Sequence, residues 1–314
     1  MTVTRPARLT GAALCAALAL LAAVWILKDL AALGSPAGLA WSWSGDHYLP
    51  ARGPAATSLV DPLLLAVSVA TAVAALRSRH AASALVATGV VTLALRLPGL
   101  WALGTGALVT ALLDVALAAG LVITAAAGRR RADRPHEQLP TRPRAGRAVA
   151  AGILLAVAAL TVVLWEAHWA TELRLQLTVD RFVGGRSTFT PVLAPPPAWL
   201  SLVLVGLYGT AAVSAFARAR HTRAFGLLAG AFLTACGFAA FARVVRVGLL
   251  PHLTDAPTFE QLYVLTAAFG LFGGIAVLAL LAGRGAPVAA PAPYGPYGSY
   301  GPPPAPPYPP PPGW

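Results

Sequence analysis

Eight long runs of apolar residues, separated by short segments rich in arginine, proline or glycine, dominate the pattern of this chain. Each run is about 17–22 residues long, the length of helix that crosses a hydrocarbon core of about 30 Å. The predicted helices span 10–31, 57–76, 82–97, 106–127, 148–168, 198–217, 224–243 and 260–282. The pattern therefore predicts an all-α integral membrane protein with eight transmembrane helices, whose even number puts both termini on one side.

The same landmarks recur in the two halves of the chain. The matching pairs are Trp25 with Trp165, the basic turns 77–80 and 218–221, Gly89 with Gly230, and the Ala-Gly-Arg sequences at 127–129 and 282–284. Because a repeat fixes the architecture, we predict two tandem four-helix repeats in the same orientation, at 1–128 and 148–284. A basic cytoplasmic linker, 129–147, joins them, and a tail, 285–314, follows.

Composition excludes a water-soluble fold. The chain is 57% hydrophobic and 11% charged, with a mean hydropathy of +0.70. Soluble domains carry about 25% charged residues, so this chain has too few polar side chains to cover a core. We expect the helices to face lipid.

The net charge of +12 is distributed very unevenly. If both termini are cytoplasmic, the inside segments hold fifteen basic and two acidic residues, and all remaining segments hold eight basic and nine acidic residues. An excess of arginine on one side is the positive-inside pattern. We therefore predict a cell-membrane protein with cytoplasmic N- and C-termini. Its basic face would contact anionic headgroups, so the charge requires no nucleic acid.

Two long segments lie on the predicted outer side. Residues 32–56 contain Trp41, Trp43 and Tyr48, which are typical of the headgroup region. In the other segment, apolar and polar residues alternate from 173 to 180. This period of two predicts a strand. Gly184-Gly185 would form a turn and 186–192 a second strand, giving a small outer β-hairpin.

The end of the chain has a different composition. Residues 286–314 carry no charged side chain and consist mainly of proline, glycine and tyrosine. Such a segment cannot bury enough apolar surface to fold, so we predict a disordered cytoplasmic tail. Its Pro303-x-x-Pro306 sequence is typical of polyproline docking motifs and provides a possible contact for a protein partner.

Motifs for catalysis and cofactor binding are not found in the sequence. His136-Glu137 begins like a zinc-binding HExxH motif, but Pro140 stands where the second histidine is needed. Cys15 and Cys236 lie at different predicted depths, so we expect two small buried apolar residues rather than a disulfide. We predict no catalytic residue, metal or cofactor.

Asp61, Arg96 and Asp114 form the one sharp polar constellation. Counted from the cytoplasmic helix ends at 1.5 Å per residue, they lie about 24, 24 and 21 Å deep, on three successive helices. An isolated charge there costs at least about 2.5–3.5 kcal/mol, so pairing is strongly favoured. Two interpretations remain open: a pocket for an ion, proton or small polar solute, or a structural ion triad in which Asp61 also caps its helix.

Other polar and small residues have simpler explanations. A second outer group lies mostly at helix ends, where snorkelling accounts for the charges; it comprises Lys28, Asp29, Glu166, His168, Arg243, Arg246 and Glu260. Gly226-x-x-x-Gly230 and Gly270-x-x-x-Gly274 predict close helix packing within the monomer.

In general character the chain resembles the uncharacterised multi-pass membrane proteins of high-GC Gram-positive bacteria. The similarity lies in one lysine against 22 arginines and in the Pro/Gly/Tyr-rich segment 291–314. It implies a membrane location and transfers no functional residue.

Three classes of function follow from the sequence. The first is a membrane scaffold or envelope-associated protein that binds partners through its tail, linker and outer hairpin. The second is a transporter or permease-like subunit that handles an ion or small polar solute at Asp61, Arg96 and Asp114, since parallel duplications are common in transporters. A membrane-embedded enzyme ranks third, because no catalytic constellation is evident.

Overall fold

The computed structural model describes residues 2–45, 55–78, 81–102, 105–130, 144–185, 190–219 and 221–283. In this part of the chain, eight helices are long and apolar enough to cross a membrane, which confirms the eight predicted spans and fits a multi-pass membrane protein. They are α1 (Arg5–Leu33), α3 (Val60–Arg77), α4 (Ala82–Arg96), α6 (Thr105–Ala127), α7 (Ala145–Glu172), α9 (Pro197–Phe216), α10 (Thr222–Val247) and α11 (Thr258–Ala282). Large apolar side chains such as Leu20, Ile123 and Val213 are about two-thirds exposed on the outside of the bundles, a surface suited to lipid rather than water.

The remaining elements are short. They are α2 (Pro36–Trp43), α5 (Gly99–Ala102), α8 (Leu175–Val183), the 3₁₀ helix η1 (Leu250–His252), and the two-residue strands β1 (Thr2–Val3) and β2 (Arg129–Arg130). The strands pair antiparallel, so the start of the chain is held against the end of α6. Except for these, the described part of the chain is helical, turn or loop.

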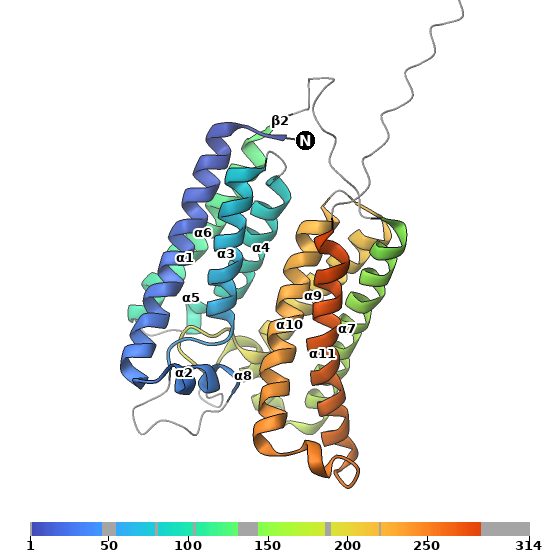
Figure 1. The fold of residues 1–314 in the computed structure, drawn as a ribbon. Coiled ribbons are helices and arrows are strands. Elements are labelled where there is room, and N and C mark those ends of the chain that lie inside the picture. The colour runs from blue at the N-terminus through green and yellow to red at the C-terminus, as the bar shows by residue number, and fades with distance from the viewer. Residues whose placement is uncertain are drawn as a thin grey trace, which may run out of the picture.

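The helices form two four-helix units that lie side by side (Figure 1). We call α1, α3, α4 and α6 the N-terminal unit, and α7, α9, α10 and α11 the C-terminal unit. In each unit the first helix packs against the second and fourth, and the third packs against the second and fourth. The units meet where α4 contacts α9 and α10. We call the end of the molecule that carries α2 and α8 the distal end (bottom of Figure 1).

Equivalent contacts recur in the two units. Gly89 on α4 faces Val122 on α6, and Gly230 on α10 faces Val277 on α11. Likewise, Gly128 after α6 packs against Ala7 on α1, whereas Gly283 after α11 lies beside Arg147 on α7. In both pairs the matching glycines lie against the equivalent helix of their own unit, although the contacting side chains differ. A tandem duplication predicts such shared contacts, although the duplication itself remains a prediction.

Glycines allow the closest helix contact in the molecule's C-terminal unit. A Cβ atom on Gly270 would lie 3.0 Å from the Cα of Gly237, so α10 and α11 approach backbone to backbone. Gly230 lies against Leu278 and Gly274 against Thr234 along the same seam. This confirms the predicted role of the small residues in packing within the monomer.

The predicted outer β-hairpin is wrong over its first strand. Leu175–Val183 is helix α8, whose apolar residues Leu175, Val179 and Phe182 fall on one helical face, although Leu175 and Val179 also fit the alternating pattern. Because both periods fit so short a segment, tertiary contacts decided between them. Asp180 is buried and is contacted by Gln176 one turn earlier, at 3.3 Å. Residues 190–192 form no strand, and 186–189 lie outside the described residues.

Other predictions from the sequence have mixed outcomes. Trp41 and Trp43 lie on α2 at the distal end, whereas Tyr48, the linker segment 131–143 and the tail from 284 lie outside the described residues. Cys15 and Cys236 are free thiols, the first buried and the second half-buried.

The end opposite the distal end carries arginines that bind helix carbonyls: Arg8 donates to Ala75 O at 2.7 Å, and Arg223 donates to Ala282 O at 2.8 Å.

Candidate functional site

Asp61 is fixed by the start of its own helix. The backbone N–H of Ser58 donates to Asp61 Oδ2 at 2.7 Å, and the Val60 N–H donates to Ser58 Oγ at 3.3 Å. This reciprocal pattern has the form of a capping box at the start of α3. The capping role considered for Asp61 is therefore present, and its second oxygen remains for another partner.

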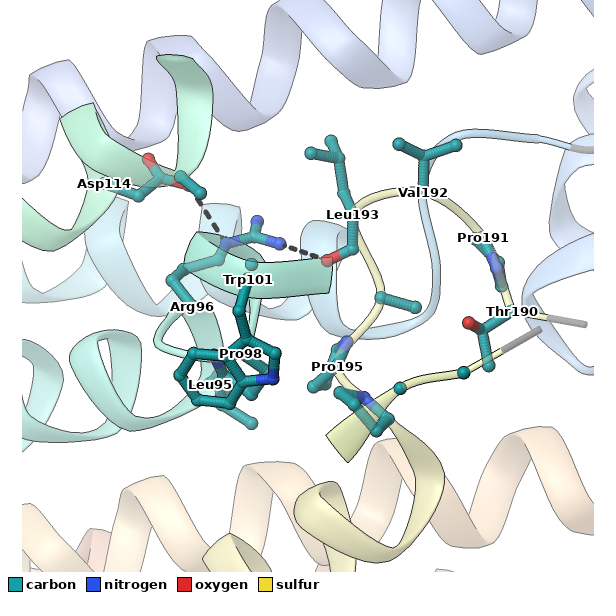
Figure 2. A pocket seen from close by; sticks show the side chains of 16 residues that line it. Leu95, Arg96, Pro98, Trp101, Asp114, Thr190, Pro191, Val192, Leu193 and Pro195 are labelled. Carbon is teal, nitrogen blue, oxygen red and sulfur yellow. Dashed lines mark hydrogen bonds and ion pairs between the residues drawn. The ribbon is translucent and has the colours of Figure 1, made fainter. Parts of the chain in front are cut away.

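That partner is Arg96, at the last residue of α4. Nη2 of Arg96 lies 2.5 Å from Oδ1 of Asp61, and Nε lies 3.0 Å from Oδ2 of Asp114 on α6. Nη1 donates to the Leu193 carbonyl at 2.8 Å. Figure 2 shows Arg96 between Asp114 and Leu193. The structure thus brings together Asp61, Arg96 and Asp114, for which the rise per residue of a helix predicted similar depths in the membrane.

The three charged groups are buried and do not cancel. Asp61, Arg96 and Asp114 are at most 5% exposed, so each has lost nearly all of its contact with solvent or headgroups. Burial of this kind is tolerable only with close opposite charges and hydrogen bonds. With all three ionised, two carboxylates and one guanidinium leave a net charge of −1. Asp61 also has Ser58, whereas Arg96 is the one described residue that pairs with Asp114.

A cavity of about 460 Å³ adjoins Arg96 and Asp114. We call it the distal polar cavity (Figure 2). One wall comes from the end of α4 and from α5, including Pro98 and Trp101, and the other comes from residues 190–196. Three prolines of that segment, 191, 195 and 196, have no N–H to donate. The segment therefore brings more hydrogen-bond acceptors than donors to the cavity, beside a group with one more carboxylate than guanidinium.

Asp29 supports the same region and was misassigned to the snorkelling group. It is 6% exposed and accepts hydrogen bonds from the N–H groups of Ala56 and Thr57, at 3.1 and 2.7 Å, and from the Thr57 hydroxyl. The Leu193 N–H in turn donates to Ala56 O at 2.9 Å. The signal in the sequence was an acidic residue near the C-terminus of a helix, where the helix dipole disfavours it unless a specific partner is present.

The cavity also depends on residues far apart in sequence. Trp101 donates to the Val183 carbonyl at 2.8 Å, and Trp199 donates to the Ala94 carbonyl at 2.8 Å. The two indoles meet edge to face, with centroids 6.0 Å apart. They tie α5 to α8 and α4 to α9, so the cavity depends on contacts between the two halves of the chain. Nothing in the local sequence pattern identified the Leu193 carbonyl or these contacts.

Several members of the second outer group are held by neighbours rather than free at the interface. Glu166 pairs with Arg181 at 3.0 Å and accepts from the Ser201 hydroxyl at 2.7 Å. Lys28 lies 4.5 Å from the ring centre of Trp25, and Arg246 lies 4.3 Å from that of Trp41. These are cation–π distances.

Among its described residues, the C-terminal unit has no charged triad that matches Asp61, Arg96 and Asp114. The positions equivalent to Asp61 and Asp114 are near Leu202, which is exposed, and Phe269. Among the residues that the structure describes, no cluster of three or more His, Cys, Asp or Glu side chains could hold a metal ion. In comparisons with known proteins, no family model, no curated protein and no solved structure matches this chain.

Proposed function

We propose that this multi-pass membrane protein is a permease-like subunit that binds a small cation or protonated amine in the distal polar cavity. The observation that carries the proposal is the position of Asp114. This carboxylate borders a cavity of about 460 Å³ and belongs to a buried group with one more carboxylate than guanidinium. Ion pairs that served only to join helices would require neither an adjoining cavity nor a second carboxylate for one guanidinium.

The charge balance selects the class of solute. A bound cation would neutralise the net charge of −1 and reduce the desolvation cost of two carboxylates that share one arginine. An anion would face both Asp114 and the acceptor-rich segment 190–196, and is therefore disfavoured. The volume lies within the range of about 300–1,000 Å³ that is typical of small-molecule sites.

The architecture supports the same class. The two units share helix neighbours and glycine contacts that a parallel duplication would produce, and such duplications are common among transporters. We further propose that the distal end faces away from the cytoplasm of the cell membrane, because the arginine-rich segments lie at the opposite end. Those segments would contact anionic headgroups.

The scaffold function, which the sequence placed first, has less support from the geometry. It relied on the outer hairpin, whose first strand is helix α8, and on the linker and tail, which lie largely outside the described residues. It stays a prediction, as does the expectation that the protein is not an enzyme. A partner-binding tail and a solute-binding cavity are compatible in one chain.

The test measures the thermal stability of the purified protein in sodium, ammonium and methylammonium chloride, with N-methylglucamine chloride at equal ionic strength as the reference. A ligand at about 100 times its Kd stabilises the folded state by about 2.7 kcal/mol. We expect at least one small cation to raise the Tm of the wild type but not of Asp114→Asn. Asp255→Asn, which removes an exposed carboxylate, is the matched control and should respond like the wild type. Cation responses that are the same in Asp114→Asn and the wild type would leave the triad with a structural role alone.

A further inference from the structure

The C-terminal unit contains a second and larger cavity, of about 770 Å³, among α7, α9, α10 and α11 at the distal end. Phe269, which corresponds to Asp114, lines it. Gly237, 141 residues after Arg96, lines it as well. At the depth where the N-terminal unit buries its charged triad, the C-terminal unit therefore has a mainly apolar cavity. Its deep walls include Leu204, Leu233 and Val162.

Charged groups border this cavity together with aromatic rings. Arg243, near the end of α10, and Glu260, in the first turn of α11, both line it, and neither has an ion-pair partner among the described residues. Phe259 and Tyr263 stack edge to face around Trp165, with centroids 5.2 and 6.4 Å away. A cation, an anion and an aromatic belt at the end of an apolar cavity match the profile of a lipid from headgroup to chain.

The cavity also has a neighbour on the lipid-facing surface. A groove of about 430 Å³ between α7 and α11 shares Thr161, Trp165, Phe259 and Thr266 with it. Its other lining residues are Leu164 and Leu262, which are 60% and 50% exposed, and His168. The shared residues make the groove and the cavity continuous, and the exposed leucines give an acyl chain an apolar path from the bilayer side of the bundle toward its interior.

We propose that this cavity binds one zwitterionic phospholipid from the distal leaflet. Its acyl chain lies between α7, α9, α10 and α11, its phosphate faces Arg243, and its ammonium group faces Glu260. A lipid with both charges satisfies both residues, whereas an anionic lipid leaves the Glu260 carboxylate opposed by negative charge. This site is distinct from the distal polar cavity and does not depend on the function proposed there.

The first test uses the full chain, purified in detergent, incubated with phosphatidylethanolamine and analysed for bound lipid by native mass spectrometry. Ala240→Phe places a ring into the cavity, which Ala240 lines. Ala242→Phe adds the same ring two residues away on α10, at a position that does not line it. We expect about tenfold weaker lipid retention in Ala240→Phe, equivalent to about 1.4 kcal/mol, and wild-type retention in Ala242→Phe. Equal retention in both variants would mean that the lipid is annular, and would overturn the proposal.

The second test changes the charged residues without changing the volume of the cavity. It tests the proposed phospholipid site even if Ala240→Phe fails to fold. The protein is given phosphatidylethanolamine and phosphatidylglycerol with identical chains. Wild type should retain the ethanolamine lipid preferentially, and Glu260→Gln should lose that preference by several-fold. Arg243→Gln should lower retention of both lipids, while Arg246→Gln, whose side chain lies over Trp41 outside the cavity, should behave like wild type. An unchanged headgroup preference in Glu260→Gln would contradict the assignment.

Discussion

Arg96 connects helices of the N-terminal unit at a depth in the membrane where an unpaired charged group costs free energy. Its guanidinium contacts Asp61 on α3, Asp114 on α6 and the Leu193 carbonyl before α9. One side chain thus connects three helices of one unit to the other unit. Sequence predicted the two carboxylate partners, because helix rise fixes depth within a membrane. It did not predict the carbonyl, which comes from a loop 97 residues away.

Removal of Arg96 tests this pairing. Arg96→Leu leaves two buried carboxylates without a countercharge, and breaking such a group costs about 3–5 kcal/mol. The double variant Arg96→Leu with Asp114→Leu removes one of those carboxylates and should be more stable than Arg96→Leu alone. Thermal unfolding in detergent measures both, with Arg174→Leu, which removes an exposed arginine, as control. If the loss of stability in the double variant equals the sum of the losses in the two single variants, Arg96 and Asp114 do not interact.

At the scale of elements, α10 and α11 of the C-terminal unit are in direct backbone contact at Gly237 and Gly270. A Cβ atom on Gly237 would collide with the backbone of Gly270 and Leu271, which cannot move away as a flexible side chain can. The glycine spacing already indicated helix packing. Which faces meet, and that both helices belong to one unit, follows from the tertiary structure.

The corresponding prediction concerns Gly237→Ala. It should separate the two helices and destabilise the protein by about 1–3 kcal/mol, as overpacking does. Gly206→Ala and Gly209→Ala on α9 are matched controls, because a Cβ atom there meets nothing within 4 Å. They should be neutral, or more stable by up to about 1 kcal/mol through helix propensity. Circular dichroism during heating would measure all three, and a neutral Gly237→Ala would exclude a tight seam.

At the scale of the whole molecule, the arginine distribution and the helix directions agree. Described arginines of the predicted inside segments, such as Arg8, Arg147 and Arg223, lie at the end opposite α2 and α8. This agreement supports one orientation for both units, since each contains an even number of spans. The membrane side of that end follows from the charge rule alone.

Reporter fusions test this orientation. Fusions after Thr141 and after Trp314 should report a cytoplasmic location, and a fusion after Arg181, near the end of α8, should report the opposite side. A fluorescent protein that folds in the cytoplasm, paired with a phosphatase active outside it, distinguishes the two. A phosphatase signal from the fusion after Trp314 would refute the predicted orientation, and together with a cytoplasmic signal after Thr141 it would also refute the even number of spans in the second half.

The sequence by itself determined the eight helices, their order and the common depth of Asp61, Arg96 and Asp114. Apolar length sets a membrane span and 1.5 Å per residue sets depth, and neither depends on neighbours. The tertiary structure alone decided that residues 175–183 are helical, that Leu193 completes the arginine's partners, and that one cavity adjoins Arg96 and Asp114 while another lies within the C-terminal unit. Short segments fit two periodicities equally well, and cavities arise where side chains from different helices fail to fill the space between them, so both depend on contacts between residues distant in sequence.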